Sequence, residues 1–486
     1  MSATCRDEAQ ELLALSEPLV DAVPRIGQAL ARWRADLLAL LEGDTETLAS
    51  ERKLEALTAE LRETWLRAAH SYSNPQWKSP PHALKRALPG GGSISYNYER
   101  ALRPTSIEKR LAAFRPAPPG WDEAHLVFAS GMAAISTLLQ AHLRVARPLS
   151  GDPTILAALW GGYFETYILL DTLRGPGFGW FRPGTQAELA EATSQSTYDL
   201  LIAEPVTYDW DMAVLDLDSL GQAWSQRRST RPGAVILDTT LSGDELPHTR
   251  LLDTFGESPP SLVAVVSSGS KLDQQGLELT NVGLLSLFTP AGATRTAAGL
   301  ATYLEKLRSS LGTGLSLDEL VALEAPFFLD RAGSTRFARA VFDSNEILAR
   351  GIRRVGGLFS SIEHPTKGAD AKPAWAVGPF VVFDLREEAP AHHRLLLAVV
   401  QEEARRRGLS LTLGSSFGFR GHRFEAIQPE PMGSKGLFKV ALGARGGPSR
   451  DGIVELFDKL ASYPDMQSLR RTFAPAMAVR APTARR

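Results

Sequence analysis

Residues 262–271 read Leu-Val-Ala-Val-Val-Ser-Ser-Gly-Ser-Lys. The first five residues are apolar, which is typical of a strand that is buried on both faces. Hydroxyl side chains and then an amine, Lys271, follow directly. Because ligands bind at the carboxyl ends of the strands in open α/β sheets, this segment predicts a buried strand that ends in a binding site.

Apolar runs of similar length recur along the middle of the chain, at residues 125–128, 155–160, 200–203, 234–237 and 282–287. Helical stretches separate these runs. The pattern predicts an α/β domain with a mostly parallel sheet over residues 94–335.

A second pattern begins near residue 336. Predicted helices alternate there with predicted strands, the helices at 336–354, 392–407 and 451–462 and the strands at 380–383, 409–413 and 438–442. This order predicts a smaller α+β domain over residues 336–486, with a loose tail from residue 470.

The first 93 residues differ from both of these regions. Apolar residues recur at helical spacing before and after Gly43, so residues 1–73 are predicted to be helical. Residues 74–93 are rich in Pro and Gly and are predicted to be an extended linker. We expect residues 1–93 to form an N-terminal helical extension that packs on the larger domain rather than a separate binding module.

Composition narrows the possible functions. The chain has 486 residues with 53 Lys and Arg against 55 Asp and Glu, so its charge gives no global reason to expect a nucleic acid or an anionic membrane as partner. Cys5 is the only cysteine and the nine histidines show no metal-binding spacing, so neither disulfides nor a metal site is predicted. The charged first residues do not resemble a secretory signal, and no apolar run is long enough to span a membrane. We therefore expect a cytoplasmic protein.

Polar groups that suit one cofactor follow several of the apolar runs. Ser130 and Gly131 open a predicted helix, whose free N–H groups can hold a phosphate. Asp238 can keep a pyridine nitrogen protonated, and Lys271 can form a Schiff base with an aldehyde. Pyridoxal phosphate requires these groups, and Tyr163 is placed to stack on its ring.

Longer motifs extend this pattern. Four segments read Ser-Gly-Met-Ala-Ala (130–134), Tyr-Phe-Glu-Thr-Tyr (163–167), Asp-Thr-Thr (238–240) and Ser-Gly-Ser-Lys (268–271), and residues 98–105 read Tyr-Glu-Arg-Ala-Leu-Arg-Pro-Thr. In this order they resemble the motifs of the Cys/Met-metabolism family of pyridoxal phosphate enzymes, the relatives of cystathionine γ-synthase, cystathionine γ-lyase and methionine γ-lyase. The resemblance runs from about residue 94 to residue 462.

The resemblance implies fold type I, which is a mostly parallel seven-stranded sheet flanked by helices with a smaller α+β C-terminal domain. It implies that Lys271 holds the cofactor and moves protons, that Asp238 faces the ring nitrogen, and that Tyr163 stacks on the ring and helps to protonate the leaving group. The implied cofactor-binding positions are Ser130, Gly131, Met132, Tyr163, Asp238, Thr240, Ser268, Ser270 and Lys271. Tyr98 and Arg100 would reach the cofactor phosphate of a neighbouring subunit, which implies a homodimer or a homotetramer with shared active sites.

The chain departs from the family at substrate-facing positions. Lys439 stands where the family has the arginine that binds the substrate α-carboxylate, and Arg103 stands where the family has the asparagine of its Asn-Pro-Thr motif. A lysine is a point charge and cannot reproduce the bidentate grip of a guanidinium group. The candidates for binding the substrate are therefore Lys439 and the arginines Arg445, Arg420, Arg423 and Arg103.

We accordingly expect a pyridoxal phosphate-dependent lyase or transferase of amino-acid metabolism. The resemblance favours β- or γ-elimination, or γ-replacement, on an amino acid with a sulfur or activated-oxygen leaving group. The altered positions favour an unusual substrate in specialised biosynthesis, with a new bond formed to a vinylglycine-type intermediate.

Three alternatives stay open. An aminotransferase or a lyase of a Cα bond would use the same lysine and aspartate. A non-catalytic relative could keep the motifs. Residues 414–418 also match the Gly-x-Ser-x-Gly motif of serine hydrolases, although the only histidine after this motif, His422, comes within a few residues and with no acid between.

Overall fold

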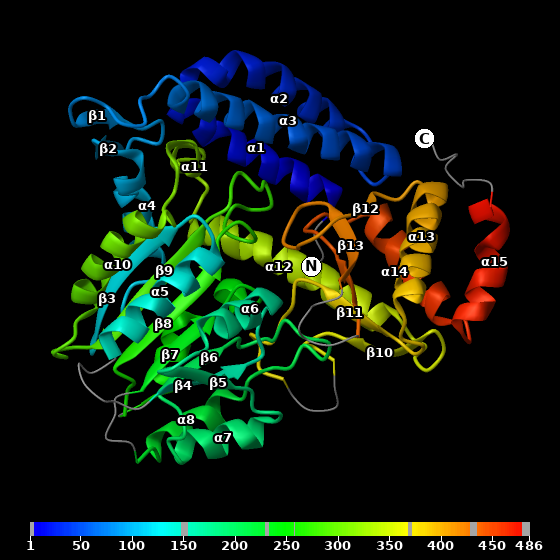
Figure 1. Cartoon of the computed structure of the whole chain (residues 1–486). Coiled ribbons are helices and arrows are strands. Elements are labelled where there is room, and N and C mark those ends of the chain that lie inside the picture. The colour runs from blue at the N-terminus through cyan, green and yellow to red at the C-terminus, as the bar shows by residue number, and fades with distance from the viewer. Residues whose placement is uncertain are drawn as a thin grey trace, which may run out of the picture.

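The computed structural model describes residues 4–146, 154–228, 233–256, 258–367, 372–427 and 435–478. Three parts are visible in Figure 1: a group of N-terminal helices, a large sheet covered by helices, and a smaller sheet covered by helices. The boundaries predicted after residues 93 and 335 stay predictions.

Three helices form the N-terminal group, namely α1 (Cys5–Ala22), α2 (Gly27–Glu42) and α3 (Leu48–Ser73), with the short 3-10 turn η1 (Pro24–Ile26) between the first two. Thr4 begins α1 in a reciprocal capping arrangement with Asp7, and the hydroxyl of Thr47 caps α3. Trp33 and Trp65 are fully buried. Trp33 lies between α2 and α3, where its indole donates to the carbonyl of Leu57. The predicted helical character and the break near Gly43 agree with these bounds.

The predicted linker is partly ordered. It contains most of an antiparallel hairpin of β1 (Leu84–Ala87) and β2 (Ser93–Tyr96). The turn η2 (Glu99–Ala101) and helix α4 (Thr105–Phe114) then lead into the large sheet.

The large sheet has seven strands in the order β3-β9-β8-β7-β6-β4-β5. Their bounds are β3 (Trp121–Phe128), β4 (Ile155–Trp160), β5 (Phe178–Phe181), β6 (Leu200–Ala203), β7 (Ala234–Asp238), β8 (Leu262–Ser268) and β9 (Gly283–Pro290). The strands from β8 to β5 are parallel, and β9 runs antiparallel to both of its neighbours. Helices cover both faces, which explains why the central strands are continuous apolar runs.

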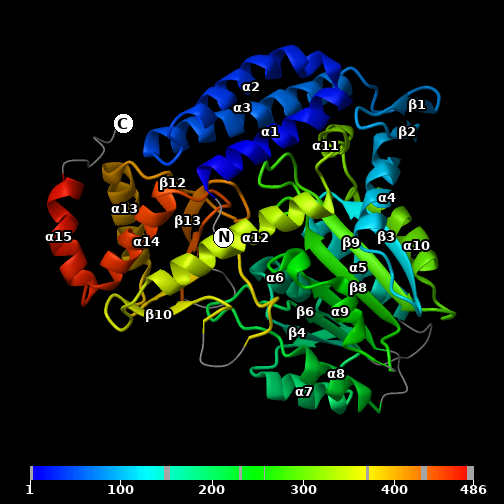
Figure 2. The same cartoon turned by 180° about the vertical axis from the view of Figure 1, so that it is seen from behind.

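The helices and turns of this part are α5 (Gly131–Ala146), α6 (Phe164–Leu173), α7 (Gln186–Ser194), α8 (Leu217–Ser225), η3 (Gly243–Glu245), α9 (His248–Asp253), α10 (Ala297–Leu311) and α11 (Leu317–Leu323). The long helix α12 (Arg331–Gly351) runs from the large sheet to the small one (Figure 2).

The small sheet has five strands in the order β10-β11-β14-β13-β12. Their bounds are β10 (Phe359–Glu363), β11 (Val381–Leu385), β12 (Leu411–Leu413), β13 (His422–Ile427) and β14 (Leu437–Ala441), and the helices are α13 (Pro390–Arg407), α14 (Pro448–Ala461) and α15 (Met466–Ala478). β10 and β13 were not predicted. The prediction of a loose tail from residue 470 was wrong as far as residue 478, because α15 includes that segment.

The N-terminal helices contact both the large domain and the small domain. Figures 1 and 2 show them lying across the top of the molecule, over α11 at one end and beside the small domain at the other. The indole of Trp65 donates to the carbonyl of Ala322 in α11, and Arg52 donates to the carbonyl of Gly408 after α13. Within the described residues, no helix combines the length and the apolar character needed to cross a membrane.

Candidate functional site

Five of the six strands of the large sheet that share one direction are followed by candidate residues at the same edge. β4, β6, β7 and β8 are parallel, and β3 has the same direction because it and β8 both pair antiparallel with β9. The residues that follow these strands are Ser130 after β3, Tyr163 after β4, Glu204 after β6, Asp238 at the end of β7, and Lys271 after β8. The fold therefore brings the predicted motifs to one edge.

Asp238 lies at the centre of this edge. Its carboxylate accepts hydrogen bonds from the backbone N–H of Thr240 (2.9 Å) and from the Thr240 hydroxyl (2.5 Å). The same hydroxyl accepts the backbone N–H of Ser268 (2.9 Å), so the ends of β7 and β8 are tied together. Burial raises the pKa of Asp238, while the bonds from Thr240 oppose that rise.

Glu204 adds a second carboxylate, which is buried and which the sequence analysis did not predict as a site residue. It accepts the backbone N–H groups of Gly162 (3.1 Å), Tyr163 (2.7 Å) and Tyr208 (2.6 Å). Burial, and then the nearby charge of Asp238, raise the pKa of Glu204 to about 8. Glu204 fixes the turn that presents Tyr163. Its position directly after an apolar run was the available signal, and it is the same signal that indicated Asp238.

Lys271 projects from the turn after β8. Burial lowers its pKa, with Glu278 opposing that change and Lys439 adding to it. A lowered pKa leaves more of the amine unprotonated, which is what a nucleophile or a general base requires. Two hydroxyls lie just before it, where Ser268 Oγ and Ser270 Oγ are 3.1 Å apart.

The loop after β3 lies directly against the end of β8. The hydroxyl of Ser130 accepts the backbone N–H of Ala133 (3.0 Å) at the start of α5. Gly283 pairs with the ends of both β3 and β8, and a Cβ there would collide with the backbone oxygen of Ser130. The absence of a side chain at Gly283 thus lets the α5 N-terminus approach Ser268, and free N–H groups at such a terminus attract a phosphate. Met132, in the first turn of α5, accepts a weak bond from Thr166 (3.9 Å).

Tyr163 belongs to a cluster of four rings, which we call the aromatic cluster: Tyr163, Tyr208, Phe380 and Phe417. Successive ring centroids in this order are 5.3, 5.4 and 5.4 Å apart. The Nζ of Lys271 lies 5.9 Å from the Phe417 centroid, so the cluster joins the lysine to the tyrosine. Burial and then Glu165 raise the pKa of Tyr163, so its hydroxyl is protonated at neutral pH.

Lys439 contacts the same cluster from the small domain. Its Nζ lies 2.6 Å from a carboxylate oxygen of Glu425 and donates to the Tyr208 hydroxyl (2.7 Å). Burial lowers the pKa of Lys439, and the charge of Glu425 opposes that change. Sequence reasoning missed Glu425 and Tyr208, because their proximity to Lys439 depends on strand register and on packing between domains.

The predicted arginines are each paired with a glutamate. Arg445 grips Glu8 of α1 with two bonds (2.8 and 3.1 Å), and Arg420 pairs with Glu11 of α1 (2.8 Å). Arg423, on β13, pairs with Glu278 (3.3 Å). Whether any of these arginines holds a substrate stays a prediction.

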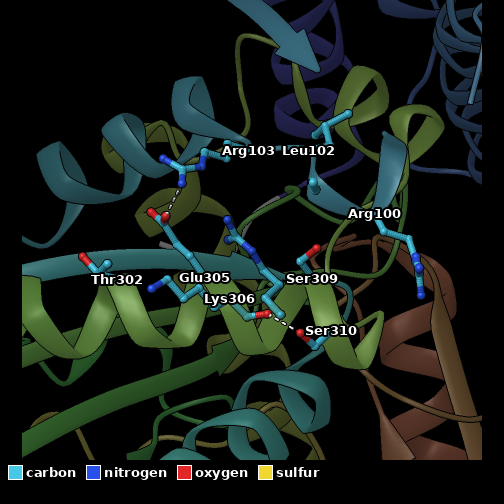
Figure 3. Close-up of a pocket in the computed structure, with 10 residues that line it drawn as sticks. Arg100, Leu102, Arg103, Thr302, Glu305, Lys306, Ser309 and Ser310 are labelled. Atoms are coloured by element: carbon cyan, nitrogen blue, oxygen red, sulfur yellow. Dashed lines mark hydrogen bonds and ion pairs between the residues drawn. The ribbon is translucent and has the colours of Figure 1, made fainter. Parts of the chain in front are cut away.

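The predicted inter-subunit residues are exposed and lie just before α4. Tyr98 is 41% exposed, and the Arg100 guanidinium lies over its ring at 4.9 Å. Arg100 and Arg103 line a cavity of about 350 Å³ beside α10. Figure 3 shows Arg103 turned toward Glu305, with which it pairs at 3.0 Å, while Arg100 points away from both.

The Gly-x-Ser-x-Gly motif occupies a turn rather than the start of a helix. Ser416 has a left-handed backbone (φ 76°), and its N–H donates to Glu425 (3.1 Å). The next element is the strand β13, whose His422 accepts the backbone N–H of Gly443 (3.1 Å). This arrangement lacks the strand-to-helix turn that the hydrolase motif requires.

The chain resembles known proteins in its fold but not closely in its sequence. The chain matches no protein-family model and no curated protein sequence. It resembles solved structures of a methionine γ-lyase from Micromonospora echinospora (TM-score 0.52, 19% identity, 76% of this chain and 89% of that chain) and of the metB protein from Corynebacterium glutamicum (0.51, 18%, 74% and 85%). A cystathionine γ-lyase from yeast is similar at TM-score 0.52 and 17% identity, over 83% of this chain and 96% of that chain. The predicted fold is confirmed: this chain has the fold of these enzymes of Cys/Met metabolism, fold type I.

Proposed function

We propose that the chain binds pyridoxal phosphate at the edge of the large sheet and acts there on an amino acid. The observation that carries the proposal is the meeting of a half-buried carboxylate (Asp238), a half-buried amine of lowered pKa (Lys271) and a hydroxyl-lined helix start at the ends of strands of one sheet. The likeness in fold to a methionine γ-lyase and a cystathionine γ-lyase supports it.

The residues fit this cofactor. Asp238 is a half-buried carboxylate whose hydrogen bonds, within the described part of the chain, come from Thr240 alone, so a protonated ring nitrogen would supply a directly paired positive charge. Ser268, Ser270 and the α5 N-terminus, with Gly131 and Met132, offer donors for a phosphate. Lys271 would bind the aldehyde carbon, and Tyr163 would cover the ring.

Bound there, the cofactor would supply an electron sink that stabilises a carbanion at Cα of the substrate. The Lys271 Nζ would take the Cα proton and carry protons onward along the substrate. Its lowered pKa makes it competent as a base. The protonated hydroxyl of Tyr163 would donate to the leaving group, and Glu204 would hold Tyr163 in place through the backbone.

Within this chemistry we propose β- or γ-elimination, or γ-replacement, with a sulfur or activated-oxygen leaving group. The substrate is an unusual amino acid of specialised metabolism, because Lys439 and Arg103 stand where the family has other residues. The enzyme would act in the cytoplasm as a homodimer or a homotetramer, with Tyr98 and Arg100 reaching a neighbouring subunit. The exposure of Tyr98 leaves it available for that contact.

Product analysis tests the reaction type. The holoenzyme would be incubated with methionine, cystathionine and O-acylhomoserines, with and without an added thiol or 2-oxo acid. Release of ammonia together with the side-chain leaving group, or its replacement by the thiol, would support the proposal. Transfer of the amino group to the 2-oxo acid would instead identify an aminotransferase. Turnover of methionine or cystathionine at ordinary enzyme rates, with no better substrate, would contradict the unusual substrate.

A further inference from the structure

A buried ion pair occupies the face of the small sheet that meets the large domain. Lys439 on β14 and Glu425 on β13 are direct partners in the antiparallel register, so their side chains share one face. Leu437 and Ala441 lie on that same face and pack with Tyr208, Phe380 and Phe417. The alternate residues of β14 face the core of the small domain.

Several contacts fix this pair. Lys439 is 2% exposed, and its Nζ is 2.6 Å from Glu425 and 2.7 Å from the Tyr208 hydroxyl. Glu425 is buried as well and also accepts the backbone N–H of Ser416 at 3.1 Å. Ser416 adopts an unfavourable left-handed backbone to make that bond, so the position of Glu425 is determined from two sides.

The pair is close enough to Lys271 to affect it. Lys439 Nζ lies 5.6 Å from the Phe417 centroid, and Lys271 Nζ lies 5.9 Å from the same centroid. The charges that face Lys271 are those of Glu278, Lys439, Arg423 and Glu165. Both cations in this set are already paired, Lys439 with Glu425 and Arg423 with Glu278.

We propose that the Lys439–Glu425 pair makes the site select amino-acid derivatives whose carboxyl group is uncharged, as an amide, an ester or a thioester. This inference rests on the proposed function. A free carboxylate at Lys439 would lie beside the Glu425 carboxylate, and two anions repel strongly where water is excluded. A neutral carbonyl brings no charge. Tyr208 accepts the bond from Lys439, so its own O–H proton is available to donate to such a carbonyl.

The test is a binding titration of the cofactor-loaded protein, read from its visible absorption and from its thermal midpoint. Three matched sets of probes differ only at the carboxyl group: glycine, alanine and methionine, each as the free acid, the amide and the methyl ester. The amides and esters should perturb both signals at a concentration at least about tenfold lower than the free acids.

Variants of the pair test the cause. Glu425→Gln leaves the charge of Lys439 unopposed, so this variant should bind the free acids at least about tenfold more tightly than the wild type. The double variant Glu425→Gln/Lys439→Met removes both charges, so it should lose the gain from Lys439 and bind free acids and amides about equally. It therefore still tests the cause if the single variant unfolds. Glu63→Gln breaks the exposed pair with Arg67 on α3 and should not change the preference.

The outcomes separate the two proposals. A protein that takes up no pyridoxal phosphate overturns the proposed function and this inference with it. A protein that takes up the cofactor but binds the free acids as tightly as the amides, or binds none of the amides and esters, overturns the inference alone. If Glu425→Gln and the double variant both keep the wild-type preference for amides and esters over free acids, the inference is overturned as well.

Discussion

Glu8→Gln should destabilise the protein more than any comparable change on the surface of α1. The Glu8 carboxylate receives two bonds from Arg445, at 2.8 and 3.1 Å, and lies 3.8 Å from Arg420. Arg445 is 1% exposed, so the substitution leaves a guanidinium charge buried without its counter-ion. Breaking a buried pair in this way costs about 3–5 kcal/mol. The folded-to-unfolded ratio should therefore fall by at least about a hundredfold.

A control exists on the same helix. Glu17 pairs with Arg34 at 2.9 Å, but its side chain is 64% exposed. Glu17→Gln should therefore cost less than about 1 kcal/mol. The assay is urea unfolding followed by tryptophan fluorescence, because Trp33 and Trp65 are buried in the N-terminal group. The double variant Glu8→Gln/Arg445→Met should recover most of the loss, since it removes both charges.

A shift of the urea midpoint for Glu8→Gln that is no larger than the shift for Glu17→Gln would contradict this prediction. The Glu8–Arg445 pair would then contribute nothing to the attachment of α1 to the small domain.

Three further predictions follow from the described contacts. Burial lowers the pKa of His422 to about 3, so this side chain stays neutral in the folded protein but is protonated below about pH 6.5 in the unfolded chain. The free energy of unfolding therefore falls as the pH is lowered below about 6.5. In urea titrations at pH 5 and 6, His422→Gln should reduce that fall by up to about 1.4 kcal/mol per pH unit. Gly283→Ala places a methyl group against the Ser130 backbone, so it should lower the free energy of unfolding by about 1–3 kcal/mol and weaken retention of the cofactor. The control Gly175→Ala places its methyl group in open space and should do neither, so equal thermal midpoints of the two variants would contradict this prediction. Arg100→Ala should lower the affinity for pyridoxal phosphate in an equilibrium titration, and an unchanged affinity would refute its proposed contact across a subunit interface.

The sequence predicted the central strands well for a physical reason. β4 and β6 begin and end where the apolar runs do, because parallel strands covered on both faces must be apolar throughout. The ends of such strands gather at one edge, so Asp238 and Lys271 could be assigned to a common site before any geometry was known.

Other features were beyond sequence reasoning. β13 has a mixed pattern of burial and contains His422, Arg423 and Glu425, so no apolar run marks it. Arg445 appeared to be available for a ligand because its partner, Glu8, is 437 positions away in the chain. The pairing of Lys439 with Glu425 depends on the register of two strands, which the composition of neither strand determines.

The visible absorption spectrum of the purified protein, wild type against Lys271→Ala, shows directly whether the chain holds pyridoxal phosphate through Lys271. We expect a yellow wild-type protein after addition of pyridoxal phosphate and the loss of that absorption band in the variant. Asp238→Asn should alter the band without abolishing it, because the lysine is still present. A wild-type protein that stays colourless with added pyridoxal phosphate, or a Lys271→Ala protein with an unchanged spectrum, would contradict the proposal that Lys271 holds pyridoxal phosphate.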